Sequence, residues 1–219
     1  MVAGSLAAVT RAVIFDCDGV LVDTELVSNA VLAELLTEAG MPTTLDDCMR
    51  DFRGRSMASV FAILEQRFGS PPPPIIAERY YAEVEAVFAR DLQAVPGIVD
   101  ALDRIGLPSC VASSGPHHKL AVTLRATGLW ERFDGRIFSA TEVARGKPAP
   151  DLFLHAAARM GFEPAGTAVV EDSVPGVQAA VAAGMRALAF TRHSDPAELA
   201  AAGGEPFDDM AELPALLAR

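Results

Sequence analysis

The chain has 219 residues, a length that favours one large domain or one domain that carries a smaller module. Hydrophobic residues make up 51% and charged residues 21%, so the chain can bury a core and is not disordered. The 18 Lys and Arg against 29 Asp and Glu give a net charge of −11. This charge argues against a nucleic acid or an anionic membrane surface as partner, but not against a small anionic substrate.

The cysteines and the N-terminal segment indicate where the protein works. Cys17, Cys48 and Cys110 are widely spaced and match no disulfide or metal-binding framework, as is typical of a reducing compartment. No basic region precedes the first apolar stretch, so we expect no signal peptide. No apolar run approaches the roughly 18 residues that cross a membrane. These features predict a soluble, cytoplasmic protein.

Short, continuous apolar runs predict the strands of a sheet that is covered on both faces. The runs span residues 11–16, 109–113, 167–171 and 186–191, with a shorter one at 135–139. Helical stretches lie between the later runs, at 97–105, 116–127, 150–160 and 174–183. Alternation of strand and helix implies βαβ units. We therefore expect an α/β fold with a Rossmann-like parallel sheet.

Residues 24 to about 90 break this alternation and indicate helices only. The expected helices span 25–39, 45–52, 57–68 and 75–89, and the prolines at 71–74 form a rigid connector before the last one. We predict an all-helical domain at 23–90, inserted into an α/β core made of residues 1–22 and 91–219. A further surface helix is expected in the Ala-rich stretch at 197–202.

Two aspartates follow the first predicted strand directly. Asp16 and Asp18 flank Cys17 and precede Gly19, which permits a sharp exit from the strand. Ligands bind at the carboxyl edge of open α/β sheets. Carboxylates two residues apart supply a nucleophile and a separate acid or base, or two contributions to one hard cation. Alone, the motif is equally compatible with a solvated turn.

Glu171 and Asp172 follow another predicted strand, so their carboxylates are expected at the same edge. Four converging acids repel one another unless a cation neutralises them. Oxygen ligands without His or Cys favour Mg²⁺ over zinc. The alternative for this segment is a helix N-cap, for which Ser173 is the better candidate, while Asp172 is the better metal ligand.

Ser113 and Ser114 follow the second long strand and open a helix, where a hydroxyl and backbone N–H groups suit an anion. A plain N-cap is the competing interpretation. Lys147 lies between Gly146 and Pro148 in a loop that we expect to be rigid. It is either an ordinary surface lysine or a positive charge aimed at the anion.

These motifs, in this order and at strand ends, resemble those of the haloacid dehalogenase superfamily. The resemblance covers the α/β part of the chain, and the helical insert is similar to the cap domain of the β-phosphoglucomutase-like phosphatases. It implies that Asp16 attacks the phosphorus and forms an aspartyl-phosphate. Asp18 would protonate the leaving oxygen and then activate the water that releases phosphate.

The resemblance also implies a bound metal and residues that bind the phosphoryl group. Mg²⁺ would be held by the Asp16 carboxylate, the Asp18 backbone carbonyl and Asp172, with Glu171 in support. Ser113 and Lys147 would bind the phosphoryl oxygens, and these two residues, Asp16 and Asp18 form the expected catalytic set. Phosphoryl transfer depends chiefly on positioning and on cations around the transferred group.

Other functions fit the motifs less well. Metal-independent dehalogenases lack a second aspartate such as Asp18, and receiver domains carry no helical insert. A phosphosugar mutase is the nearest rival, but the stretch at 26–29 lacks the histidine that mutases place there. A regulator that binds a phosphometabolite without turnover would have lost a carboxylate. We therefore expect a phosphatase acting on a small phosphorylated metabolite.

Substrate choice is expected to lie in the helical insert, because the core motifs contact only the phosphoryl group. Arg53, Gly54 and Ser56 form the best candidate loop, together with Ser114 of the core. Arginine suits a carboxylate or a second phosphate. The loop and the stretch at 113–119 resemble bacterial sugar-acid phosphatases, so we expect a sugar or sugar-acid phosphate as substrate. A monomer or weak dimer is expected, with neither nucleic acid nor membrane as partner.

Overall fold

A computed structural model describes residues 9–52 and 57–219, and the predictions for Arg53, Gly54 and Ser56 fall outside these ranges. The chain divides into two compact units, one formed by the segment up to Val22 with Ala94–Arg219 and the other by Asp23–Gln93. The second unit ends at Gln93, so the core resumes at Ala94, three residues after the start expected at residue 91. The backbone N–H of Asp23 donates to the carbonyl of Gln93 at 3.0 Å, which joins the two ends of the second unit.

The first unit is built on a sheet of six parallel strands in the order β3–β2–β1–β4–β5–β6. The strands are β1 (Ala12–Phe15), β2 (Ser109–Ser113), β3 (Ile137–Ser139), β4 (Thr167–Glu171), β5 (Arg186–Phe190) and β6 (Glu205–Phe207). The direction of the strand order changes between β1 and β4, which places the switch point of the sheet between these two strands.

Helices connect the strands of this unit. They are α5 (Ile98–Arg104), α6 (His117–Ala126), α7 (Trp130–Phe133), α8 (Asp151–Met160), α9 (Val174–Ala182), α10 (Pro196–Ala201) and α11 (Leu213–Leu217), with the short 3₁₀ helices η1 (Ala140–Glu142), η2 (Pro164–Gly166) and η3 (Met210–Glu212). The parallel Rossmann-like sheet predicted from the apolar runs is confirmed.

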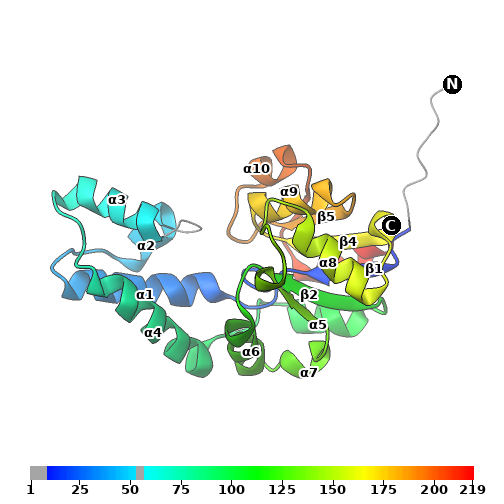
Figure 1. The fold of residues 1–219 in the computed structure, drawn as a ribbon, viewed down its shortest axis with the longest axis horizontal. Coiled ribbons are helices and arrows are strands. Elements are labelled where there is room, and N and C mark those ends of the chain that lie inside the picture. The colour runs from blue at the N-terminus through cyan, green and yellow to red at the C-terminus, as the bar shows by residue number, and fades with distance from the viewer. Residues whose placement is uncertain (1–8, 53–56) are drawn as a thin grey trace. The chain divides into compact units, whose positions relative to one another are not determined.

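Both faces of the sheet are covered, as the continuous apolar runs require. On one face, Ile14 of β1 and Val169 of β4 are fully buried against Phe153 of α8 and Val177 of α9. Helices α8 and α9 lie together on this side in Figure 1, and α6 and α7 lie on the other. The next residue of β1, Phe15, points to that other face, since side chains alternate along a strand, and its ring lies 6.0 Å from that of Phe133 in α7.

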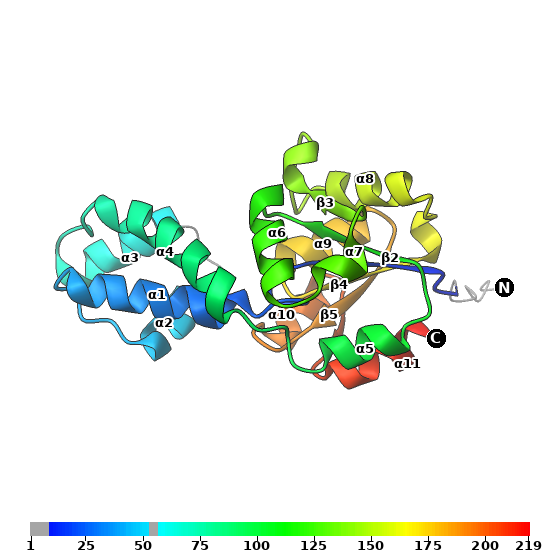
Figure 2. The same cartoon turned by 90° about the horizontal axis from the view of Figure 1, so that it is seen from below.

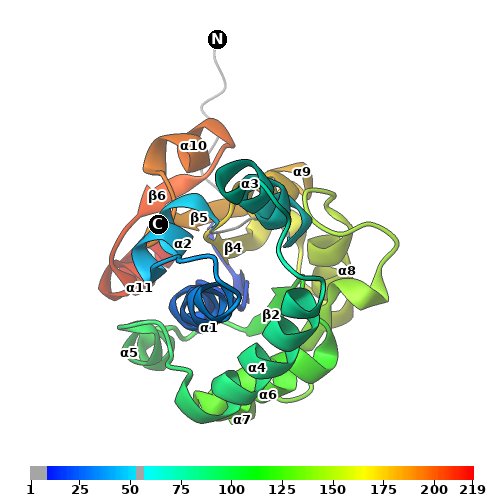
Figure 3. The same cartoon turned by 90° about the vertical axis from the view of Figure 1, so that its left-hand side faces the viewer.

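In its described residues, 23–52 and 57–93, the second unit contains helices and no strand: α1 (Thr24–Glu38), α2 (Leu45–Asp51), α3 (Met57–Phe68) and α4 (Ile75–Asp91). Helix α1 packs against α4 and α2, and Figures 2 and 3 show α1 beside α4 from two directions. Thr44 and Asp47 form a capping box at the start of α2, which fixes where that helix begins. Among the described residues, no helix has the length and apolar character needed to cross a membrane.

Candidate active site at the carboxyl edge of the sheet

Asp16 and Glu171 meet at the switch point of the sheet. Strands β1 and β4 pair in parallel, with Phe15 opposite Val170, so the residues that follow them emerge side by side. The Asp16 N–H donates to the carbonyl of Val170 at 2.9 Å, which extends the pairing to the aspartate itself. The crevice outside the carboxyl ends of the strands at such a point is where α/β sheets bind ligands.

Lys147 bridges these two carboxylates. Its Nζ donates to Asp16 Oδ1 at 2.6 Å and to Glu171 Oε1 at 2.5 Å. The side chains of Lys147, Asp16 and Glu171 are 6%, 9% and 1% exposed, so the group is almost completely shielded from solvent. The Lys147 ammonium also lies 4.9 Å from the centre of the Phe153 ring, whose face favours a cation. Lys147 is therefore a buried side chain and not a surface lysine.

The charges of this group do not balance, because one ammonium faces two carboxylates. Burial raises the pKa of Asp16 and outweighs the attraction of Lys147, and the nearby Glu171 and Asp18 carboxylates help to raise it to about 7. Burial alone would lower the pKa of Lys147, but its two carboxylate partners raise it above the usual value, so this lysine stays charged. The buried group carries an excess negative charge that a further cation could neutralise.

The second oxygen of Glu171 is also engaged. Glu171 Oε2 accepts from the backbone N–H of Ser173 at 2.7 Å and from its hydroxyl at 2.9 Å. The Ser173 hydroxyl in turn accepts from the N–H of Gly176, which makes Ser173 the N-cap of α9, as predicted. Glu171 thus holds Lys147 with one oxygen and the start of α9 with the other.

Gly176 leaves the room that Glu171 occupies. A Cβ at this position would lie 1.8 Å from Glu171 Oε1, which its bond to Lys147 holds in place. We expect Gly176→Ala to destabilise the fold by about 1–3 kcal/mol through overpacking, although alanine favours a helix by about 1 kcal/mol over glycine. Urea denaturation measures the change, and Gly106→Ala, where a Cβ meets nothing within 4 Å, is the matched control. Equal stability of the two variants would contradict this account.

Asp172 approaches the turn that carries the two aspartates. Its Oδ2 lies 2.1 Å from the position that a Cβ on Gly19 would occupy, and Gly19 has a positive φ of +75°. Only glycine adopts this backbone conformation readily and at the same time leaves room for the carboxylate. The absence of a side chain at Gly19 therefore brings the Asp172 carboxylate against the Asp16–Gly19 segment.

The donor chemistry at this edge fits a hard divalent cation. Within residues 9–52 and 57–219, no three His, Cys, Asp or Glu side chains form a cluster that could hold a metal. The ligand set implied by the motifs, however, needs only the carboxylates of Asp16 and Asp172 and the backbone carbonyl of Asp18. All three are oxygen donors, which Mg²⁺ prefers, and the excess negative charge beside Lys147 favours a cation.

Ser113 lies at the end of β2, next to β1, and is buried with 1% exposure. Its hydroxyl accepts from the N–H of Gly115 at 3.2 Å, and the carbonyl of Gly115 accepts from the Ser139 hydroxyl at 2.8 Å. Helix α6 begins only at His117, without a side-chain cap, so Ser113 is not its N-cap. The serine instead shapes the turn before α6, while Ser114 is exposed.

Lys119 is a site residue that the motifs did not single out. It lies in the first turn of α6, and its Nζ donates to Asp18 Oδ2 at 2.6 Å. Burial would lower the pKa of Lys119, but the Asp18 carboxylate raises it above its usual value. The signal available in the sequence was its place in the first turn of the helix that follows Ser113, where a side chain can reach back to the sheet edge.

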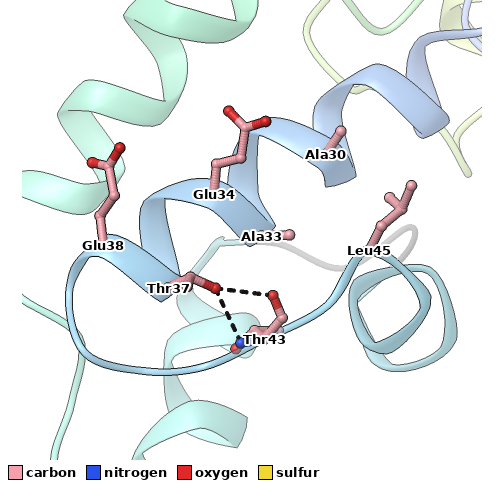
Figure 4. A pocket seen from close by; sticks show the side chains of 7 residues that line it. All are labelled: Ala30, Ala33, Glu34, Thr37, Glu38, Thr43 and Leu45. Carbon is pink, nitrogen blue, oxygen red and sulfur yellow. Dashed lines mark hydrogen bonds between the residues drawn. The ribbon is translucent and has the colours of Figure 1, made fainter.

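A pocket in the helical unit offers different chemistry. It lies between α1 and α2, and Figure 4 shows Thr37 bonded to Thr43 at its base. Its lining consists of Ala30, Ala33, Glu34, Thr37, Glu38, Thr43 and Leu45. None of these lining residues is a cation, so the pocket supplies no charge for a phosphoryl group. The edge of the sheet, with Lys147 and Lys119, is the better candidate site.

Comparison with known proteins shows what the whole arrangement is similar to. The sequence profile of the haloacid dehalogenase-like hydrolases matches residues 10–184. The chain is 32% identical to the 6-phosphogluconate phosphatase of Escherichia coli, with 82% of each protein covered.

Solved structures agree with the sequence comparison. A haloacid dehalogenase-like protein of unknown function from Agrobacterium tumefaciens is 36% identical, with a TM-score of 0.87 and with 95% of this chain and 98% of the other covered. A hydrolase of the same family from Deinococcus radiodurans, with bound phosphate and sodium, is 32% identical, with a TM-score of 0.86 and 96% of each chain covered.

Proposed function

Since the chain belongs to the haloacid dehalogenase-like hydrolases and is a phosphatase acting on phosphorylated metabolites, we propose that it hydrolyses a sugar or sugar-acid phosphate through an aspartyl-phosphate on Asp16, with Mg²⁺ as cofactor. The observation that carries the proposal is the buried contact of Lys147 with Asp16 and Glu171. It presents a carboxylate beside a fixed positive charge at the edge of the sheet where a phosphoryl group would bind.

In the first step, a carboxylate oxygen of Asp16 attacks the phosphorus of the ester. The bond from Asp16 to phosphorus forms as the bond from phosphorus to the leaving oxygen breaks. Asp18 gives its proton to that oxygen, so the product leaves as a neutral alcohol and Asp18 becomes a carboxylate. The two aspartates suit these different tasks, because Asp16 is buried while Asp18 is partly exposed.

In the second step, the Asp18 carboxylate takes a proton from a water molecule whose oxygen attacks the phosphorus. The bond from phosphorus to Asp16 breaks, phosphate leaves, and both aspartates return to their starting states. Lys147 and Ser113 bind phosphoryl oxygens during both steps, and the hold of Glu171 on Lys147 keeps the ammonium in place. The work of the site is thus to position the groups and to stabilise charge.

The cation completes the charge balance of this arrangement. Asp16, the Asp18 carbonyl and Asp172 would hold Mg²⁺, and Glu171 would support the site through Lys147. When bound, the ion supplies positive charge that draws the anionic ester and the Asp16 carboxylate together. The raised pKa of Asp16 supports this assignment, because a neighbouring cation favours the ionised carboxylate that the attack requires.

The substrate assignment rests on the relatives and on the helical unit. One relative is named 6-phosphogluconate phosphatase, which is a sugar-acid phosphate specificity. We propose that Arg53, Gly54 and Ser56 recognise the part of the substrate beyond the phosphoryl group, together with the exposed Ser114. The protein would work in the cytoplasm as a monomer or weak dimer, in keeping with its three free, buried cysteines.

A phosphate-release screen tests the function. Phosphorylated sugars, sugar acids and phosphoglycolate are incubated with the protein and Mg²⁺, and free phosphate is measured. We expect turnover to be highest on a sugar or sugar-acid phosphate, to fall at least about 100-fold in excess chelator and to return with added Mg²⁺. Turnover that persists in chelator would remove the metal from the proposal. Isomerisation of β-glucose 1-phosphate without phosphate release would replace the phosphatase with a mutase.

A further inference from the structure

We propose that Lys119 is a positioning residue for Asp18, holding the carboxylate that exchanges the proton with the leaving group. This inference rests on the proposed roles of the two aspartates. The Lys119 ammonium lies 2.6 Å from Asp18 Oδ2, and the two side chains are 32% and 30% exposed. The contact joins the turn after β1 to helix α6, which are 101 residues apart in the chain.

Each of the two lysines of the site contacts a different aspartate. Lys147 comes from the loop before α8 and contacts Asp16 together with Glu171. Lys119 comes from α6 and contacts Asp18. The carboxylates of Asp16 and Asp18 are only two residues apart and repel each other, so a separate ammonium for each favours two distinct positions. The nucleophile and the proton carrier are thereby kept apart.

The rest of α6 fixes where Lys119 starts. Thr123 donates its hydroxyl to the Lys119 carbonyl at 3.1 Å, within the first turns of the helix. The Lys119 Cδ lies 3.4 Å from the position that a Cβ on Gly115 would take, so its stem passes close over the glycine. Gly115 is itself held by Ser113 and Ser139. The turn from which Lys119 reaches Asp18 is therefore held in place by hydrogen bonds.

The chemistry of the first step gives this contact a consequence. Asp18 begins that step protonated and ends it as a carboxylate, so negative charge grows on it as the leaving oxygen takes the proton. An ammonium within hydrogen-bond distance stabilises the growing charge and orients the carboxyl group. The rate increase that this contact gives is large when the leaving oxygen needs the proton, as in an alkyl phosphate. It is small for p-nitrophenyl phosphate, whose leaving group departs without one.

Two substrates and the variant Lys119→Met test the proposal. The quantity compared is kcat/KM, because it reports the steps up to departure of the leaving group. With 6-phosphogluconate, or the best alkyl phosphate of the screen, we expect kcat/KM to fall about 10- to 100-fold, a part of what a general acid contributes. With p-nitrophenyl phosphate we expect a change within about twofold. Lys119→Arg should restore most of the alkyl phosphate activity, since it retains a cation.

A double-mutant cycle separates action through Asp18 from a direct role. On an Asp18→Asn background, Lys119→Met is expected to have no further effect on the alkyl phosphate, since the group on which it acts has been removed. Independent, multiplicative losses would overturn the proposal, as would equal losses on both substrates or none on either. Lys119→Gln repeats the measurement if the methionine variant does not fold, and His118→Ala, at the exposed neighbouring position, is the control for α6.

Failure of this inference can be told from failure of the proposed function. The function predicts that the wild-type protein releases phosphate from both substrates, whatever Lys119 does. If the wild type hydrolyses neither substrate, the phosphatase assignment to this site fails. If it hydrolyses both and the variants show no leaving-group dependence, only the role of Lys119 fails.

Discussion

Replacing Asp16 with asparagine is expected to reduce phosphate release by about 10⁴-fold or more, because an amide is a poor nucleophile and no aspartyl-phosphate can form. We expect the stability of the folded protein not to decrease. Burial raises the pKa of Asp16, so its ionised form is unfavourable in the folded protein, and the asparagine removes that excess charge. Phosphate release under saturating substrate and Mg²⁺, together with thermal unfolding, measures both effects.

The matched control for Asp16→Asn is Asp208→Asn, which makes the same chemical change at an exposed position. It should retain full activity, since surface substitutions away from a site rarely matter. Near wild-type turnover by Asp16→Asn would exclude Asp16 as the nucleophile. A large loss of stability in that variant would contradict the charge imbalance argued for the buried group.

Replacing Lys147 with methionine is expected to damage both stability and activity. Asp16 and Glu171 would be left as buried carboxylates without their shared cation, and breaking a buried ion pair in this way costs about 3–5 kcal/mol. Catalysis should fall about 100-fold or more, because a positive charge on the phosphoryl oxygens is lost. Urea denaturation without metal gives the stability, and phosphate release with Mg²⁺ gives the activity.

The pH dependence of the Lys147→Met effect has a definite sign. Asp16 has a pKa of about 7 in the folded protein, well above the usual aspartate value of 3.8, so its contribution to stability is fully present below pH 3.8 and is lost as pH rises through about 7. Without Lys147 that pKa rises further, since the attraction of the ammonium is lost. The stability difference from wild type should therefore stay nearly constant at acid pH and grow as the pH rises above about 7.

Arg145→Met is the control for Lys147→Met in the same loop. Arg145 pairs with Asp151 at the surface and is 70% exposed, so its loss should change stability little at any pH. Equal destabilisation by the two variants, or a Lys147→Met effect that does not grow between pH 6 and pH 9, would contradict the account of the buried group.

Much of this fold could be predicted because its signals are local. The continuous apolar run at 167–171 coincides with β4, and the helix expected at 57–68 coincides with α3. Strand β6 was not predicted, because Pro206 weakens the strand signal and the edge position tolerates it. Helices α7 and α11 have only 4 and 5 residues, too few for a periodic pattern to stand out.

The site likewise contains residues that could be predicted from the sequence and contacts that could not. Asp16 and Glu171 follow buried strands directly, so the rule for parallel sheets was enough to predict that they share an edge. The contact of Lys119 with Asp18 joins α6 to the turn after β1 across a sequence separation of 101 residues, and no local pattern encodes it. The pairing of Lys147 with Asp16 and Glu171 likewise emerges only in three dimensions, where its burial separates it from an ordinary surface lysine.

The central claim, that Asp16 carries the phosphoryl group between the two steps, can be tested by trapping. In Asp18→Asn the first step on p-nitrophenyl phosphate needs no acid, but the second step lacks its base, so the phosphoenzyme should accumulate. Rapid mixing with Mg²⁺ and acid quenching are followed by mass spectrometry of the peptides. We predict a burst of about one equivalent of p-nitrophenol and one phosphoryl group on Asp16. A phosphoryl group on another residue, or release of p-nitrophenol and phosphate together without a burst, would contradict the claim.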